Sequence, residues 1–269
     1  TRPFVFVSPD SFKQGTTKDG LTSYIGTGPY KLASHDKDSQ ATFKRNDAYW
    51  NGKPKLKSIV AKVLPAGETS FLALQKGEVN FAFTDDRGAD NVDDSAMKKL
   101  TQDQDYQLKR STPMNTKMLV ANSSKKDSPA ADKSVRQALW HMIDRKNITK
   151  EILNGTEKPA NQLFSKNVPF ADIQLPQRDF DMNKAKQLLD EGGWKTTGKE
   201  GLREKDGKPL TMSIYFDNHS NSQKQEAELL QAKAQELGMK LKLVGESSDK
   251  VAERRTAGNY DLLFNQTWG

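Results

Sequence analysis

The sequence predicts an α/β fold, because strand and helix patterns alternate through its second half. Residues 210–216 and 239–244 alternate apolar and polar side chains, which is typical of strands with one buried face. A helical pattern at 222–237 lies between them, and a short helix at 250–256 leads into a last strand at 260–264. A β-α-β-α-β order favours a sheet with parallel or mixed strands and helices packed on its faces.

The first half of the chain is richer in predicted strands. Residues 30–32 and 41–45 predict a hairpin, and 56–64 predict a third strand. A helix is expected at 68–77, followed by a strand at 79–83. The last three elements together predict a strand–helix–strand crossover.

Between these regions the pattern predicts a strand at 117–121 and helices at 133–144, 148–153 and 183–190. Residues 195–209 are rich in charge and predict a loop. No internal repeat or low-complexity tract interrupts the chain.

Composition excludes several classes of function. The 269 residues include no cysteine, which rules out thiol catalysis, disulfides and cysteine-based zinc sites in this chain. No apolar run approaches the roughly 20 residues that span a bilayer. The net charge is +7, but basic and acidic residues are interleaved, so the charge indicates a solvated lysine-rich surface and not a nucleic-acid-binding stripe.

No catalytic constellation is visible. The three histidines, His35, His141 and His219, are far apart, and no HExxH, G-x-S-x-G or P-loop motif occurs. His141 lies inside a predicted helix, where a packed or partly exposed role is expected. The adjacent carboxylates Asp85–Asp86 and Asp93–Asp94 lack EF-hand spacing and predict solvated loop charges. We therefore expect no enzyme activity.

Three groups of motifs, in this order and spacing, resemble one family across essentially the whole chain. They are Gly26-Thr-Gly-Pro-Tyr-Lys-Leu32 with Arg45-Asn-Asp-Ala-Tyr-Trp50; Val135-Arg-Gln-Ala-Leu139 with Ile143-Asp-Arg-Lys146 and Ile152-Leu-Asn-Gly155; and Asp181-Met-Asn-Lys-Ala-Lys-Gln-Leu-Leu189 with Gly193-Trp194.

The chain is similar in these motifs to the extracellular solute-binding proteins of family 5, the receptors of peptide and nickel ATP-binding-cassette (ABC) importers. Four further segments resemble the nickel-binding branch and the opine-metallophore (staphylopine-type) branch: Arg2-Pro-Phe4, Val168-Pro-Phe170, Arg203-Glu-Lys-Asp-Gly207 and Thr267-Trp-Gly269.

The resemblance implies a two-lobed, periplasmic-binding-protein-like (type II) α/β fold, present here as an internal fragment. Residues 1–118 would form part of a β-rich lobe I, and residues 119–266 would form the α/β lobe II. Hinge strands are expected near 117–122 and 264–269. The resemblance also implies that pocket residues at both ends of the family's sequence lie outside this chain.

The resemblance further implies a ligand site for a chelated metal ion. An arginine matching Arg2 would clamp a carboxylate of the chelator, because a guanidinium offers two parallel donors. A tryptophan matching Trp268 would pack its flat face on the complex. A second carboxylate would need a second cation, for which Arg255 is expected, with Arg254 as the alternative. The expected cargo is nickel, cobalt or zinc with an opine-type metallophore or histidine, with no intrinsic cofactor and no metal ligand from this chain.

The expected partners are that chelate and an ABC permease, with the protein monomeric, extracytoplasmic and lipid-anchored at the cell membrane. Three alternatives stay open: a di- or oligopeptide receptor on the same scaffold, a hydrolase and a nucleic-acid binder. A peptide receptor would hold the ligand's α-amino group with an acid. A metallophore receptor would favour arginines in its cleft.

Overall fold

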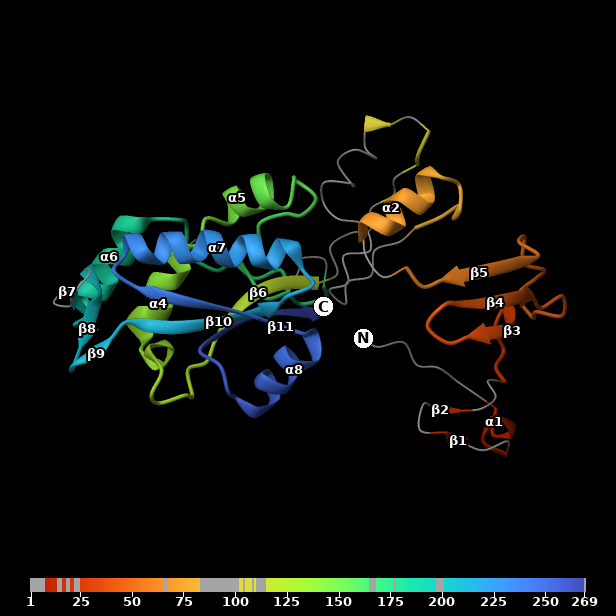
Figure 1. Cartoon of the computed structure of the whole chain (residues 1–269), viewed down its shortest axis with the longest axis horizontal. Helices are drawn as coiled ribbons and strands as arrows, with labels where there is room; N and C mark the ends of the chain where they lie inside the picture. The colour runs from red at the N-terminus through yellow and green to blue at the C-terminus, as the bar shows by residue number, and fades with distance from the viewer. Residues whose placement is uncertain are drawn as a thin grey trace. The chain divides into compact units, whose positions relative to one another are not determined.

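The computed structural model describes residues 8–13, 16–17, 20–21, 25–64, 67–82, 102–103, 105–107, 109, 115–164, 168–176, 178–196 and 201–268. It divides into two compact units, residues 1–80 and residues 81–269, coloured from red to orange and from yellow-green to blue in Figure 1. Each unit is described by itself below.

Unit 1 is built around a three-stranded antiparallel sheet. Its described elements are α1 (Asp10–Lys13), β1 (Thr16–Thr17), β2 (Gly20–Leu21), β3 (Tyr30–Asp36), β4 (Gln40–Arg45), β5 (Ser58–Lys62) and α2 (Gly67–Gln75). The predicted hairpin is confirmed, since Leu32 pairs with Phe43. The third predicted strand is confirmed as β5, which pairs with β4.

The crossover predicted after β5 is wrong. The helix is present as α2, and it ends before Gly77, whose φ of 71° lies in the left-handed region that favours glycine. Residues 79–82, however, form no strand. Among the described residues, no strand pairs with this segment. A short segment with alternating residues is not stable as a strand without the hydrogen bonds of a partner strand. The Asp85–Asp86 and Asp93–Asp94 pairs lie outside the described residues.

Unit 2 holds a four-stranded mixed sheet in the order β11-β10-β12-β6. Its described elements are β6 (Asn115–Ala121), η1 (Pro129–Ala131), α4 (Lys133–Met142), α5 (Arg145–Asn147), η2 (Ile148–Ile152), α6 (Met182–Glu191), β7 (Lys195–Thr196), β8 (Arg203–Lys205), β9 (Lys208–Pro209), β10 (Thr211–Asp217), α7 (Asn221–Glu236), β11 (Lys240–Glu246), α8 (Ser248–Ala257) and β12 (Leu262–Trp268).

The predicted β-α-β-α-β order is confirmed. β10 pairs in parallel with β11 along its whole length and with β12 at Ile214 and Tyr215. Asp261, which is 9% exposed, adds a bridge between these strands by accepting the backbone N–H of Ser213 at 2.9 Å. β6 closes the sheet antiparallel to β12, so the two segments predicted as hinge strands are neighbours.

Helices cover both faces of this sheet. Ile214 and Phe216 of β10 belong to the buried core shared with α4, α6 and α7. Tyr215, between them, lies under Arg254 of α8. Because successive side chains of a strand point to opposite faces, α7 and α8 lie on opposite faces, as Figure 1 shows.

The helix on which the core is centred, α4, follows the predicted spacing. Its buried residues are Val135, Ala138, Leu139 and Met142. It ends two residues earlier than predicted, because Ile143 adopts an extended conformation and Asp144 begins α5 by accepting the N–H of Asn147. The predicted helix at 148–153 is a π-helical turn, η2.

The charged segment 195–209 was predicted to be a loop, which is wrong. It contains three short antiparallel strands, β7, β8 and β9. They carry Arg203, whose side chain is 2% exposed. Its guanidinium donates to the carbonyl oxygens of Leu237 at 2.8 Å and Trp194 at 2.5 Å and to the carboxylate of Asp190 at 2.5 Å. A buried arginine that bonds residues distant in the sequence follows no strand or helix period, so the sequence pattern does not reveal it.

Arg203→Ala should lower the free energy of unfolding by about 3 kcal/mol, because it leaves two carbonyl groups without their donors in a buried site. Urea denaturation of the chain, followed by circular dichroism, would measure the loss. Asp190→Asn is the matched control and should cost under about 1 kcal/mol, since the Asp190 side chain is 56% exposed. A loss for Asp190→Asn as large as for Arg203→Ala would contradict this explanation.

The start of α4 is fixed by a polar cluster around Asp132. One carboxylate oxygen accepts the N–H and hydroxyl of Ser134, and the other accepts from Trp194 Nε1 at 3.2 Å and Lys205 Nζ at 2.7 Å. Burial opposes ionisation of this carboxyl, but the hydrogen bonds from Lys205 and Ser134 outweigh it and lower the pKa of Asp132 from 3.8 to about 2.

The ionised Asp132 should therefore stabilise the fold at pH values above its unfolded pKa of 3.8, and this stabilisation should be lost as the pH falls toward 2. Asp132→Asn should cost about 1–2 kcal/mol near neutral pH, and this difference should shrink between pH 4 and pH 2. Unfolding titrations of both proteins across this pH range would measure the change. A difference that is independent of pH would exclude the ion pair as its source.

Candidate functional site

All strands of the unit 2 sheet bring one end to a common edge, here called the carboxyl edge. The parallel strands β10, β11 and β12 end there at Asp217, Glu246 and Trp268. β6 runs the opposite way, so its first residue, Asn115, pairs with Trp268. After β10 the chain enters α7 on one face, and after β11 it enters α8 on the other. Open α/β sheets bind ligands where connections diverge in this way, so the carboxyl edge is the candidate site.

The turn that follows β10 is held firmly at this edge. The N–H of Asn218 donates to the Glu246 carbonyl oxygen at 2.9 Å, and the N–H of Ser220 donates to the Asp217 carbonyl oxygen at 3.0 Å. Ser220 is buried, and its hydroxyl caps α7 by accepting the N–H of Gln223. The exposed His219 is thus carried on backbone that is fixed on both sides.

His219 also has an oriented imidazole. Its Nδ1 lies 3.2 Å from Oδ1 of Asp217, which accepts the His219 backbone N–H at 2.9 Å as well. The histidine side chain is 77% exposed and the aspartate side chain is 16% exposed. The sequence placed His219 among three scattered histidines and gave it no role. Its signal was an aspartate two residues earlier, at the end of a predicted strand.

Arg254, in the last turn of α8, holds this helix against the sheet. Its guanidinium donates to both carboxylate oxygens of Glu246, at 2.5 and 2.6 Å, and lies 4.3 Å from the ring centroid of Tyr215. The hydrogen bond from Arg254 lowers the pKa of Glu246, and Glu246 in turn raises the pKa of Arg254. Arg254, the alternative for the second ligand cation, is therefore occupied by contacts within unit 2.

Arg255, the expected second cation, is the next residue of α8 and is exposed. Its Nη1 donates to Oδ1 of Asn265 on β12 at 2.6 Å. Asn265 lies three residues before Trp268, so Arg255 reaches the half of β12 that leads to the carboxyl edge. A single neutral acceptor leaves most of a guanidinium's five donors available to a ligand.

The other two expected ligand residues are less defined. The backbone of Trp268 ends β12 opposite Asn115, but its side chain lies outside the described residues. Arg2 lies outside them altogether. The structure thus places the Arg255 side chain against β12, which ends at the backbone of Trp268, and places His219 on the turn after β10. That Arg2, Arg255 and Trp268 bind a ligand stays a prediction.

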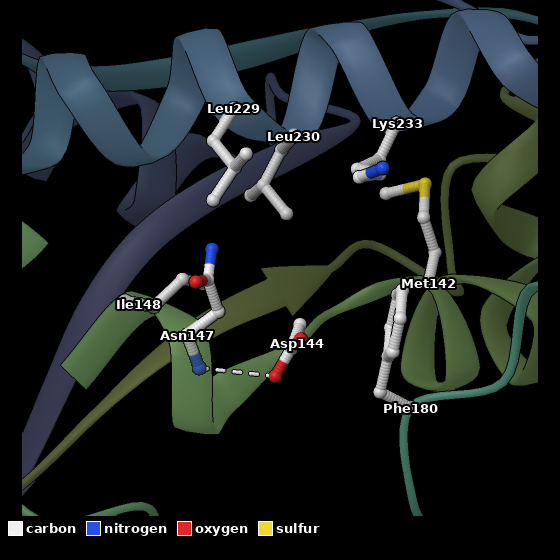
Figure 2. A pocket seen from close by; sticks show the side chains of 8 residues that line it. All are labelled: Met142, Asp144, Asn147, Ile148, Phe180, Leu229, Leu230 and Lys233. Atoms are coloured by element: carbon white, nitrogen blue, oxygen red, sulfur yellow. Dashed lines mark hydrogen bonds between the residues drawn. The ribbon is translucent and has the colours of Figure 1, made fainter. Parts of the chain in front are cut away.

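A small pocket lies elsewhere, between α7 and the ends of α4 and α5 (Figure 2). It has a volume of about 190 Å³ and mainly apolar walls, with Asp144, Asn147 and Lys233 as its polar members. In Figure 2 Asp144 accepts the N–H of Asn147, which caps α5. A ligand site for a whole chelate is usually larger, at about 300 Å³ or more.

A second, shallower pocket of about 450 Å³ lies beside Asp132, Trp194 and Lys205. These three side chains already bond one another in the cluster that begins α4. Among the residues that the structure describes, no group of three or more histidine, aspartate or glutamate side chains is gathered to hold a metal ion. No helix in the described part of the chain has the length and apolar character needed to cross a membrane.

Comparison with known proteins defines the class. Residues 3–269 match the bacterial extracellular solute-binding proteins, family 5 (middle), and the chain belongs to this family. Its fold is that of a type II periplasmic binding protein, as predicted, and its relatives are substrate-binding receptors and not enzymes.

Particular relatives lie in the nickel-binding branch. The chain is 32% identical over 268 residues to the nickel-binding periplasmic protein of Escherichia coli, covering 100% of this chain and 50% of the relative. The crystal structure of NikA from Brucella suis in complex with Fe(III)-EDTA is similar with a TM-score of 0.89 and 35% identity, over 100% of this chain and 53% of that one. The oligopeptide-binding protein AppA of Bacillus subtilis is 28% identical over 241 residues, covering 88% of this chain and 42% of the relative. The chain therefore spans about half the length of these relatives.

Arg254→Ala should lower the free energy of unfolding by about 1 kcal/mol, because it removes a bidentate ion pair and a cation–π contact. Arg255→Ala is the matched control on the adjacent position and should cost under about 0.5 kcal/mol, since it removes one exposed hydrogen bond. Thermal unfolding of the two variants would rank them. Equal losses would mean that the Glu246 pairing adds no stability.

Proposed function

We propose that this chain is part of the extracytoplasmic solute-binding component of an ABC importer, which captures a chelated transition metal and delivers it to the permease. The observation that carries the proposal is the match of the whole chain, at a TM-score of 0.89 and 35% identity, to a NikA that holds Fe(III)-EDTA. That neighbour binds a metal ion inside a polycarboxylate. The identity to a nickel-binding relative supports the same class of cargo.

The proposed cargo is nickel, cobalt or zinc with an opine-type metallophore or histidine. The protein would grip the chelator, with Arg2 and Arg255 on its carboxylates and Trp268 against its flat face. Arginine suits this task because its planar fork matches a carboxylate with two hydrogen bonds. The exposed position of Arg255 on α8, with one neutral acceptor, supports its part of the proposal.

The proposed mechanism uses two lobes that close on the chelate, with 1–118 in lobe I and 119–266 in lobe II. The pairing of β6 with β12 supports a hinge at these two segments, since neighbouring strands can bend together. The receptor would be monomeric, would bind no nucleic acid, and would be held at the membrane by a lipid anchor.

A di- or oligopeptide cargo is the second candidate, because AppA is also a relative. Native mass spectrometry and metal analysis of the full-length receptor, purified without denaturation, would test both. A stoichiometric metal ion with a small polycarboxylate is the expected result. A bound peptide mixture without metal would replace chelate transport by peptide transport.

Arg2→Ala in the full-length receptor should weaken binding of a carboxylate-rich nickel chelate by about 1.5–3 kcal/mol, the scale of a hydrogen bond to a charged group, and should leave folding nearly unchanged. Arg255→Ala and Trp268→Ala should weaken binding in the same direction. Isothermal titration calorimetry would measure each affinity. Lys224→Ala, at an exposed position of α7, is the control and should bind as the wild type does. Unchanged affinity for Arg2→Ala would remove Arg2 from the site.

A further inference from the structure

We propose that unit 2 carries a second ligand site, for a free amino acid with an apolar side chain, in the pocket between α7 and the ends of α4 and α5 (Figure 2). This site goes beyond the proposed function, because it lies away from the carboxyl edge. Leu230, which lines the pocket, is about 15 Å along α7 from the Ser220 cap, at a rise of 1.5 Å per residue. The proposal is carried by the apolar floor of the pocket, its size and the opposite charges at its rim.

The floor of the pocket is apolar and firmly packed. Met142 of α4, Ile148 of η2 and Leu230 of α7 line it, and all three are buried. Closely packed side chains keep their positions when a ligand arrives, so binding loses little conformational entropy of the protein. An apolar group that moves from water onto this floor gains free energy from its burial.

Phe180 forms a wall of the pocket that the described part of the protein leaves partly uncovered. The residue is 39% exposed, yet its backbone is held on both sides. The carbonyl oxygen of Asp179 lies 2.8 Å from Nδ1 of His141, and the N–H of Asp181 donates to the His141 carbonyl oxygen at 2.9 Å. These contacts fix the segment that carries the aromatic ring at the pocket. An apolar ligand side chain would cover the ring surface that now faces water.

The rim of the pocket holds an anion and a cation on opposite sides (Figure 2). One carboxylate oxygen of Asp144 accepts the N–H of Asn147 at 3.0 Å, and the other has no donor among the described residues. Lys233 reaches the pocket from α7 and donates to Glu236 at 2.8 Å. An ammonium has three donors, so two of those on Lys233 have no partner in the part of the chain that the structure describes. An acceptor and two donors are therefore available to a ligand.

A free amino acid has the groups that match this arrangement. Its ammonium would donate to the open oxygen of Asp144, and its carboxylate would accept from Lys233, both as charge-assisted hydrogen bonds. The Asn147 amide, at the same rim, can donate or accept.

The size of the pocket sets the size of the side chain. A dry apolar cavity of about 150 Å³ holds a benzene molecule, so a pocket of about 190 Å³ admits a slightly larger ligand. Leucine and methionine have this size, with about nine non-hydrogen atoms each. A peptide or a whole chelate needs more room. The geometry therefore favours a single amino acid with an aliphatic or thioether side chain.

Calorimetric titration of the full-length receptor with L-leucine tests the site. We expect saturable binding with a Kd below about 1 mM, which a ligand of this size reaches at ordinary efficiency per atom. Glycine lacks the apolar side chain, and N-acetyl-L-leucine amide lacks both charges. Each of these two probes should bind at least about 10-fold more weakly than L-leucine.

Asp144→Asn should weaken L-leucine binding by at least about 10-fold and leave the fold intact, because asparagine caps a helix about as well as aspartate does. Lys233→Gln should weaken it in the same direction through the loss of the cation. Lys224→Gln, at an exposed position of the same helix, is the matched control and should bind L-leucine as the wild type does. The affinity for a nickel chelate should be unchanged in all three variants.

No saturable L-leucine binding below about 1 mM would overturn the inference and leave the proposed function standing. Wild-type L-leucine affinity in both Asp144→Asn and Lys233→Gln would also overturn it, because the amino acid would then bind elsewhere. Displacement of L-leucine by the nickel chelate would overturn it as well, since both ligands would share one site. Failure of the wild-type receptor to bind any nickel chelate would contradict the proposed function alone.

Discussion

Unit 2 depends on the central strand, β10. Its inward side chains, Met212, Ile214 and Phe216, lie in the core with the helices on one face, and its backbone joins β11 on one side to β12 on the other. Parallel strands need a crossover between them, so α7 and α8 are both consequences of this pairing. The same pairing brings three strand ends to one edge, which is why polar side chains distant in sequence meet there.

Two adjacent arginines of α8, Arg254 and Arg255, make different contacts with the sheet. Arg254 is engaged by Glu246 and Tyr215, which fastens α8 to β10 and β11. Arg255, its neighbour in sequence, has one neutral partner and stays exposed. Two adjacent arginines thus have different uses, because successive residues of a helix are turned by about 100° from each other. Arg254 thus serves the fold, whereas Arg255 donates to Asn265 and leaves other N–H groups without a partner among the described residues.

The secondary structure of unit 2 was largely readable from the sequence, because its elements have a buried face that repeats with the strand or helix period. The apolar spacing of α4 and the alternation of β10 are examples. The strand prediction was wrong at residues 79–82, where apolar and polar residues alternate but no strand forms. Prediction also failed where a charged segment hides a tertiary contact, as at Arg203, which reaches the carbonyl of Leu237 across 34 residues.

For this protein, the sequence by itself determined the α/β class, the membership of the solute-binding family and the candidates Arg2, Arg255 and Trp268. Local periodicity and ordered motifs carry that information, since both depend only on near neighbours along the chain. The tertiary structure decided which arginine of the 254–255 pair is engaged, that Arg203 is buried, and that Asp217 orients His219 at the carboxyl edge. These outcomes depend on tertiary contacts between segments that are distant in the sequence, and no local sequence pattern specifies those contacts.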